Sequence, residues 1–146
     1  MRAVGRLAVR ALTVAHLALH RATGGRLGRR LAGMPVLFLT TRGRRTGRRR
    51  TVPLTYFDDG GALVVVASYA GDDRDPAWYR NLLACPEVDV TVGRERRAMV
   101  ARPATPEEKA RLWPRIVAAY AGYRRYQART DRDIPLAVLE APGAEG

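Results

Sequence analysis

The sequence contains few of the side chains on which most enzymes rely for chemistry. It has one cysteine, Cys85, which excludes an internal disulfide. Its two histidines, His16 and His20, both fall in the first 20 residues, so a nucleophile elsewhere in the chain has no obvious imidazole base. Their four-residue spacing suits a metal pair, but no carboxylate or cysteine stands near them, and we expect no metal site. With neither a nucleophile elbow nor a P-loop motif, the chain favours a reaction whose chemistry a bound cofactor supplies.

Long apolar runs are also missing. The best candidate for a transmembrane segment is "ALTVAHLAL" at residues 11–19. It is too short to span a bilayer and is interrupted by Thr13 and His16. Arginines precede it as in a signal peptide, but no small-x-small cleavage site follows. Residues 2–21 instead indicate a basic amphipathic helix, which could pack on the domain or lie on an anionic membrane. We therefore expect a cytoplasmic protein that either is free in the cytoplasm or lies peripherally on the inner face of the plasma membrane.

Acidic residues and lysine are scarce relative to arginine. The chain has 26 Lys and Arg against 14 Asp and Glu, a net charge of +12, and Lys109 is its only lysine. Part of this bias, with the abundant alanine and glycine, reflects a GC-rich coding sequence. The charge favours an anionic partner: nucleic acid, acidic lipid or a phosphorylated cofactor. A nucleic-acid binder usually adds stacking aromatics or a recognition helix to its charge, and because neither is evident we expect no nucleic-acid partner.

The positive charge is concentrated in "TTRGRRTGRRRTVPL", residues 40–54, which places six arginines in the nine positions 42–50. Apolar segments flank it on both sides. Gly43 and Gly47 could turn backbone N–H groups toward an anion, and the planar guanidinium group suits phosphate and carboxylate. Charge and glycine alone fit a solvated loop equally well.

Hydrophobic patterning predicts an α+β chain built from antiparallel hairpins in a domain of residues 25–146, after an N-terminal helix of residues 1–24. "DDGG" is a strong hairpin turn, and Pro53 predicts an edge strand or a bulge. The expected strands are residues 34–41, 51–57, 62–68, 87–92, 96–103 and 134–140.

Two further helices are predicted from their capping signals. Asp75 is a suitable N-cap, with Pro76 at the first helical position, for a short helix that ends before Pro86. Residues 105–120 begin with a capping box, formed by Thr105 and its partner three positions later, and Pro114 predicts a kink or a break. A further helical turn or two is expected from residue 122 onward.

Two groups of aromatic residues stand near these helices. Tyr120, Tyr123 and Tyr126 recur every three residues, a spacing that keeps three phenols near one face of a helix. Trp78 and Tyr79 stand at a helix start, directly after the segment "SYAGDD". Both groups could line a pocket or could simply fill the core.

Three stretches together resemble the deazaflavin (F420)-dependent nitroreductase family of actinobacteria: "PVLFLTTRGRRTGRRRTVPLTYF", "DPAWYRNLLACPEVDV" and "LWPRIVAAYAGYRRYQARTDRDIPLAVLE". The likeness extends from about residue 25 to residue 140 and rests on the TTxGRxTGxxR loop, the PxWYxN helix start and the three tyrosines. It implies a split β-barrel related to flavin-reductase folds. It also implies coenzyme F420, an 8-hydroxy-5-deazaflavin with a phosphate, a lactyl group and a polyglutamate tail, with FMN as the weaker alternative.

The resemblance also implies which residues form the site. Arg45 and Arg50 would hold the phosphate and nearby carboxylates, and Tyr123 would orient or protonate the acceptor. Tyr120 and Tyr126 would wall the pocket, and Ser68 would add a hydrogen bond. The cofactor-binding set is Arg45, Thr46, Gly47, Arg48, Arg50, Pro53, Thr55, Ser68, Tyr69, Ala70, Gly71 and Trp78.

This sequence departs from the family pattern at three positions. Tyr69 is bulkier than the small or basic residue that is usual there, which bears on ring contacts and acceptor size. Arg45 and Arg49 stand where relatives often have lysine and proline, and arginine is not equivalent to lysine at a phosphate.

By this resemblance the expected function is hydride transfer from reduced F420 to a quinone or nitro-heterocycle. The alternative is a carrier or sensor that binds a deazaflavin or flavin without turnover. Such a protein would keep the arginine loop but would need no acceptor pocket.

Overall fold

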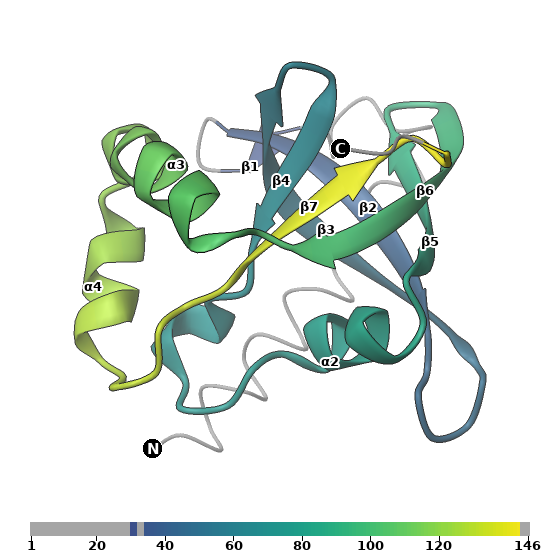
Figure 1. Cartoon of the computed structure of the whole chain (residues 1–146), viewed down its shortest axis with the longest axis horizontal. Helices are drawn as coiled ribbons and strands as arrows, with labels where there is room; N and C mark the ends of the chain where they lie inside the picture. Colours follow the sequence, from purple (N-terminus) through teal and green to yellow (C-terminus); the bar gives the residue numbers. More distant parts are fainter. Residues whose placement is uncertain (1–29, 32–33, 144–146) are drawn as a thin grey trace.

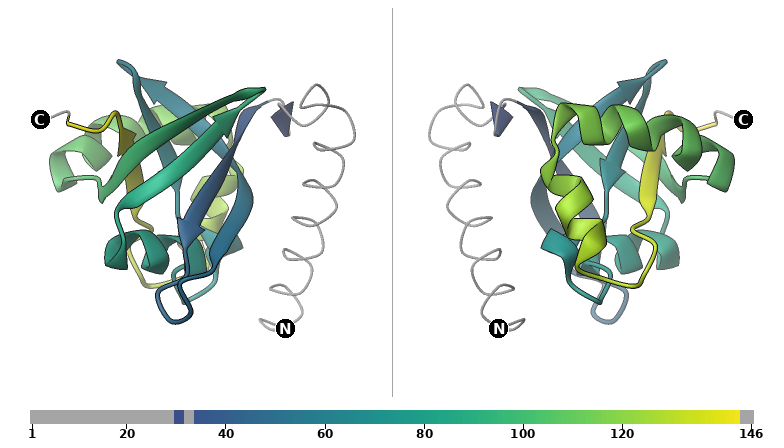
Figure 2. Two further views of the ribbon diagram at one scale, coloured as in Figure 1. Left: turned by 90° about the vertical axis from the view of Figure 1, so that its right-hand side faces the viewer. Right: turned by 90° about the vertical axis from the view of Figure 1, so that its left-hand side faces the viewer.

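The computed structural model describes residues 30–31 and 34–143 (Figure 1). The helix predicted for residues 2–21 lies outside them. The described chain forms one antiparallel barrel with helices at one end and along one side (Figure 2). Its strands are β1 (Arg30–Leu31), β2 (Met34–Arg42), β3 (Arg49–Asp59), β4 (Ala62–Val66), β5 (Glu87–Val92), β6 (Glu95–Pro103) and β7 (Leu136–Glu140). Its helices are α2 (Ala77–Ala84), α3 (Pro106–Ala119) and α4 (Gly122–Ala128), with a short 3-10 turn, η2 (Tyr69–Gly71).

Six strands close into the barrel in the order β2-β3-β4-β7-β6-β5, and β5 pairs back onto β2. The short β1 pairs with the first two residues of β2, Met34 and Pro35. Every pairing is antiparallel, which confirms the predicted α+β split barrel. All six longer strands that the sequence predicted are present.

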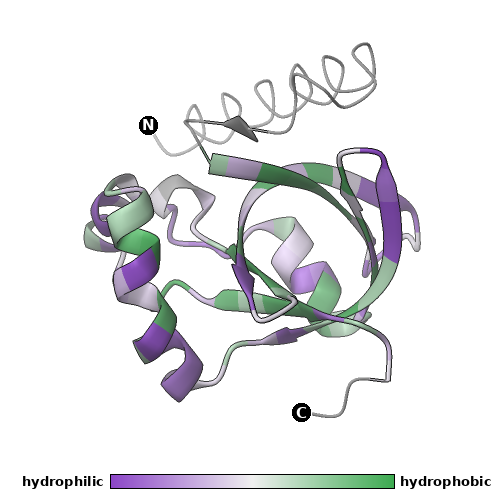
Figure 3. Ribbon diagram, turned by 90° about the horizontal axis from the view of Figure 1, so that it is seen from above, coloured by the Kyte–Doolittle hydropathy of each residue, from purple (hydrophilic) through white to green (hydrophobic). Residues whose placement is uncertain are grey.

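Strand alternation divides the core into two layers. Inward-facing residues such as Leu37, Val65 and Leu139 fill the barrel, and α2 covers one end of it (Figures 1 and 3). Residues of opposite parity, such as Phe57 and Val64, form a second cluster on the outer face of the barrel. That cluster is covered by α3 and α4; its buried members are Met34, Phe57, Val64, Val66, Leu112, Ile116, Tyr123, Ile134 and Leu136.

The position of Pro53 is explained by the pairing of β3. Along residues 49–55, β3 pairs with β2 on one side. On its other side it pairs with β4 only from Tyr56 to Asp59. The first half of β3 therefore has an edge with no strand partner in the described part of the chain, as the proline predicted.

The capping box predicted for α3 is confirmed. Thr105 Oγ1 accepts from the Glu108 N–H at 3.2 Å, and Glu108 Oε1 accepts from the Thr105 N–H at 2.8 Å. Pro114 does not break the helix, which continues to Ala119. Leu112 and Ile116, on either side of Pro114, are buried against the barrel, and this packing holds the helix together where one backbone hydrogen bond is missing.

The prediction that Asp75 caps α2 was wrong. The N-cap is Pro76, and no side chain caps that helix. The Asp75 carboxylate instead accepts from Arg132 Nη1 at 2.9 Å, a charge-assisted hydrogen bond. Strand β4 also ends two residues earlier than predicted, because the chain turns into η2 directly after Ser68.

No helix in residues 34–143 is both long enough and apolar enough to cross a membrane.

Candidate functional site

The arginine segment forms the hairpin that connects β2 to β3 and extends beyond the barrel (Figure 1). Its turn is closed by the Gly43 N–H, which donates to the Arg48 carbonyl at 2.7 Å, and by the Gly47 N–H, which donates to the Gly43 carbonyl at 2.8 Å. Gly47 has a φ of +72°, which explains the glycine there. The Arg48 N–H donates to Thr46 Oγ1 at 3.2 Å. The Gly43 and Gly47 N–H groups, which the sequence suggested could face an anion, thus already donate within the turn, as does the N–H group of Arg48.

Two of the six arginines have partners elsewhere in the fold. Both the backbone N–H and Nη1 of Arg44 donate to Asn81 Oδ1, at 3.2 and 2.9 Å. Asn81 is buried in α2 and its Nδ2 donates to Thr41 Oγ1 at 3.4 Å, so this contact fixes the hairpin against the helix. Arg49 Nη1 lies 3.3 Å from the Asp89 carboxylate, which also pairs with Arg96 at 2.8 Å.

Arg45, Arg48 and Arg50 differ from these two. Their side chains are exposed, and within residues 30–31 and 34–143 they have no ion pair or hydrogen bond. Desolvation, together with repulsion from Arg80 and Arg45, lowers the pKa of Arg44, which shows how closely the cations crowd here. An anion at this hairpin would relieve that repulsion.

The residues of β3 that follow the hairpin alternate between its two faces. Val52 and Leu54 pack toward the barrel interior. Pro53 and Thr55 therefore face outward, whereas Arg50 shares the inward parity of Val52. Arg50 and Thr55 both lie in the half of β3 that has an unpaired edge, so one ligand that follows this edge could contact both faces.

Tyr123 is the buried centre of a tyrosine cluster at the corner between α3 and α4. Its Oη lies 2.6 Å from Thr55 Oγ1, and the residue is 5% exposed. The ring centroids of Tyr120, Tyr123 and Tyr126 lie 5.3 to 6.3 Å apart in edge-to-face pairs. The spacing suggested that all three tyrosines lie on one helix, but they do not. Tyr120 is the C-cap of α3, and only the other two belong to α4.

Burial favours the protonated form of two phenols of this cluster, Tyr123 and Tyr126. Burial is the main cause that raises the pKa of Tyr123, and the hydrogen bond with Thr55 acts in the opposite direction. Burial, followed by a hydrogen bond with Tyr120, raises the pKa of Tyr126 to about 12. Both groups therefore keep their protons at neutral pH and can act as hydrogen-bond donors.

The segment of residues 68–71 packs against the same helix. Gly71 has a φ of +80°, and a Cβ added there would lie 2.7 Å from the Tyr126 carbonyl oxygen. Tyr69 has a φ of +46°, a conformation that is rare for residues other than glycine. Ser68 is buried, and its hydroxyl has no hydrogen-bond partner among the described residues. Ala70 lies between them in η2.

Trp78 lies apart from this cluster. It packs in the barrel interior, with its ring edge-to-face against Tyr79 at 6.0 Å. Its placement favours the core-filling alternative over a role as a pocket wall.

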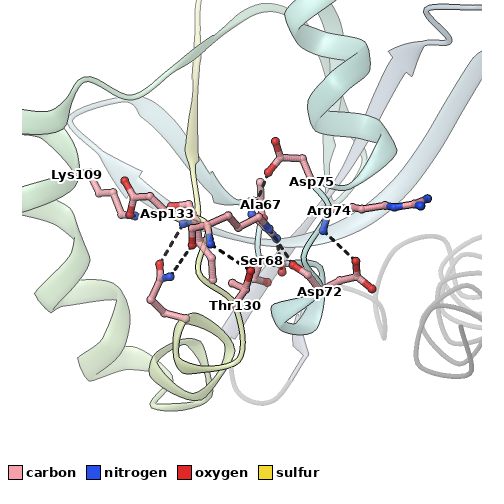
Figure 4. Close-up of polar contacts among 11 residues, drawn as sticks. Ala67, Ser68, Asp72, Arg74, Asp75, Lys109, Thr130 and Asp133 are labelled. Carbon is pink, nitrogen blue, oxygen red and sulfur yellow. Dashed lines mark hydrogen bonds and ion pairs between the residues drawn. The ribbon is translucent and has the colours of Figure 1, made fainter. Parts of the chain in front are cut away.

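Sequence reasoning missed two polar residues that hold the site together. Asn81 stands among Trp78, Tyr79 and Leu82 as the single polar member of the buried face of α2, which was an available signal. Arg132 gave no such signal, because it follows the helices in a charged stretch of ordinary appearance. It contacts residues 67, 68, 72 and 75, which are labelled in Figure 4.

Comparison with known proteins gives concordant matches. The model of a family described as F420H(2)-dependent quinone reductase matches residues 12–141. An F420H(2)-dependent quinone reductase of Mycobacterium tuberculosis is 45% identical over 128 residues, covering 85% of this chain and 86% of that protein. A solved F420-H2 dependent reductase is 38% identical with a TM-score of 0.66, covering 73% of this chain and 94% of its own. A second solved structure, a domain-swapped dimer, is 34% identical with a TM-score of 0.68 and covers 86% of this chain and 96% of its own.

Proposed function

Since the chain belongs to the F420H2-dependent quinone reductase family, we propose that it is an oxidoreductase that uses coenzyme F420 to reduce a quinone held against the buried tyrosine cluster. Activated nitro-heterocycles are a second class of acceptor. The observation that carries the proposal is the buried Tyr123 hydroxyl, 2.6 Å from Thr55 Oγ1 on the outward face of β3, where burial raises the pKa of the phenol.

The residues present fit an anionic deazaflavin. Arg45 and Arg50, exposed and without acidic partners in the described chain, would hold its phosphate and carboxylates, with Arg48 and the Thr46 N–H beside them. Pro53 and Thr55 would approach the ring along β3. When bound, reduced F420 supplies a hydride to the acceptor.

Tyr123 would donate a hydrogen bond to the acceptor oxygen on which negative charge develops. A hydroxyl can donate one bond while it accepts another, so Thr55 can donate to Tyr123 Oη and leave the phenolic proton directed at the acceptor. Because the pKa of Tyr123 is raised, the phenol orients and stabilises the acceptor oxygen without losing its own proton; the proton of the quinol comes from solvent. Tyr120 and Tyr126 would wall the acceptor, and the Ser68 hydroxyl would add a second hydrogen bond.

The test is to mix the purified protein with reduced F420 and menadione without oxygen, and to follow the return of oxidised F420 absorbance. We expect multiple turnovers, with a matched reaction that lacks protein as the blank. Tight binding of F420 with no turnover of quinones or nitro-heterocycles would instead identify the carrier or sensor.

A further inference from the structure

We propose that Arg132 is a positioning residue that holds residues 67–72 in the shape which brings Ser68 and the tyrosine helix together. The inference rests on the proposed function, because it concerns the same site. Arg132 follows α4, and the residues that accept its hydrogen bonds, at positions 67, 68, 72 and 75, are labelled in Figure 4.

The guanidinium group of Arg132 makes four hydrogen bonds, three of them to carbonyl groups of one segment. Nε donates to the Asp72 carbonyl at 2.8 Å, and Nη2 donates to the Ser68 and Ala67 carbonyls at 2.8 and 3.1 Å. Nη1 donates to Asp75 Oδ1 at 2.9 Å, which balances the charge. The Arg132 side chain is only 15% exposed.

The segment that Arg132 holds is strained and closely packed. Tyr69 is in a left-handed conformation with a φ of +46°, and such residues persist only where their surroundings enforce the conformation. Gly71 leaves no room for a Cβ beside the Tyr126 carbonyl. Three bonds from one rigid guanidinium group to carbonyls before and after Tyr69 are a sufficient constraint.

Arg132 is itself fixed to the helix that carries the tyrosines. Gln127, the residue after Tyr126 in α4, donates from Nε2 to the Arg132 carbonyl at 2.7 Å and accepts from the Ile134 N–H at 3.0 Å. Arg132 N–H also donates to Thr130 Oγ1 at 3.3 Å. Arg132 therefore joins the Ser68 segment to α4 by hydrogen bonds on both sides.

Loss of these bonds should act on turnover more than on F420 affinity. The phosphate and carboxylates of the cofactor, which make its charge-assisted contacts, would be held by arginines on a separate hairpin, which is fixed by Asn81 and which Arg132 does not contact. Residues 68–71 would border only its uncharged ring. The acceptor, in contrast, would lie between Ser68 and Tyr123, where small displacements are costly. Lysine can substitute only in part, because a single ammonium group cannot span carbonyls on both sides of Tyr69.

The test compares Arg132→Met and Arg132→Lys with a matched control, Arg102→Met. Arg102 also makes several charge-assisted bonds, to Glu108 and Glu140, but at the junction of α3 with β6 and β7, away from residues 67–75. Three measurements are made on the full chain: hydrogen–deuterium exchange of residues 67–75 without cofactor, F420 affinity by fluorescence titration, and kcat with reduced F420 and menadione.

We expect Arg132→Met to raise exchange in residues 67–75 and to lower kcat by about ten-fold or more, with F420 affinity changed by less than about three-fold. Arg132→Lys should recover only part of the loss. Arg102→Met should lower the Tm but leave both exchange of this segment and kcat within about two-fold of the native protein.

Three outcomes would decide against the proposal or separate it from the proposed function. If Arg132→Met matches Arg102→Met in exchange and kcat, Arg132 is not a positioning residue. If Arg132→Met does not fold, Arg132→Lys and Asp75→Asn take its place, and unchanged exchange in both overturns the proposal. If the native protein does not oxidise reduced F420, the proposed function fails, while the exchange measurement still tests whether Arg132 holds the segment.

Discussion

Tyr123 and Arg50 lie in different parts of the proposed site, one buried beside β3 and the other exposed at the hairpin. Their replacement should therefore affect different quantities, kcat for Tyr123 and F420 affinity for Arg50. The structure separates the six arginines of the hairpin by partner, which charge alone could not do. Arg44 and Arg49 are engaged with Asn81 and Asp89, whereas Arg50 is not engaged within the described chain.

Replacing Tyr123 with phenylalanine should lower kcat for menadione by about ten- to a hundred-fold while leaving F420 affinity almost unchanged. The ring and its packing against Phe57 remain, so only the hydrogen bond is removed. Steady-state kinetics with a fluorescence titration of F420 measure both quantities. An unchanged kcat would show that the phenol does not assist the acceptor.

Replacing Arg50 with alanine should have the opposite effect. We expect F420 to bind about ten-fold more weakly, about 1.4 kcal/mol, with kcat at saturation little changed. The matched control is Arg49→Ala, whose guanidinium group already pairs with Asp89 and should matter less. Titrations at low and high salt measure both variants. Equal losses of F420 affinity in the two variants would indicate that the overall positive charge of the hairpin attracts the cofactor, without a specific contact from Arg50.

At the scale of elements, α3 depends on one carboxylate with two roles. Glu108 completes the capping box and also accepts from Arg102 Nη1 and Nη2 at 2.7 and 2.9 Å. The Arg102 side chain, and then the Thr105 N–H, lower the pKa of Glu108 to about 2. Because the pKa in the folded state lies below its unfolded value, this stabilisation is complete above about pH 4.5 and is lost as the pH falls toward 2.

Glu108→Gln should therefore lower the free energy of unfolding by about 1–2 kcal/mol at pH 7. The full pKa shift would give more, but the Arg102 side chain is 38% exposed and solvent screens the pair. Urea unfolding at pH 7 and at pH 3 measures the difference between variant and native protein, which should be smaller at pH 3. A difference that does not depend on pH would show that the charge of the Glu108 carboxylate does not stabilise α3.

The helices also show which helix caps and helix ends can be predicted from neighbouring residues in the sequence. The capping box of α3 was predictable because both partners lie within four residues. Asp75 failed as a predicted cap because Arg132, 57 residues away, competes for its carboxylate. Pro114 did not end its helix because packing against the barrel outweighs one missing hydrogen bond.

For the whole molecule, the sequence predicts an anionic membrane surface as a second partner besides the cofactor. The basic amphipathic pattern of residues 2–21 predicts a helix that could lie on an acidic leaflet, near membrane quinones. Deleting residues 1–22 should abolish sedimentation with vesicles that contain anionic lipid, with no change in kcat for soluble menadione. Vesicles of neutral lipid are the control, and undiminished sedimentation of the shortened protein would contradict the membrane role.

The sequence by itself determined the antiparallel hairpins, the barrel class, the unpaired edge marked by Pro53 and the motifs that indicate F420, because each depends on neighbouring residues or on a recognisable pattern. Only the tertiary structure decided which polar groups engage one another. Arg44 meets Asn81 across 37 residues, Tyr123 meets Thr55 across 68, and Arg132 meets Ala67 across 65. Such contacts depend on how the barrel closes. The sequence of an arginine-rich segment therefore does not show which of its side chains remain available to a ligand.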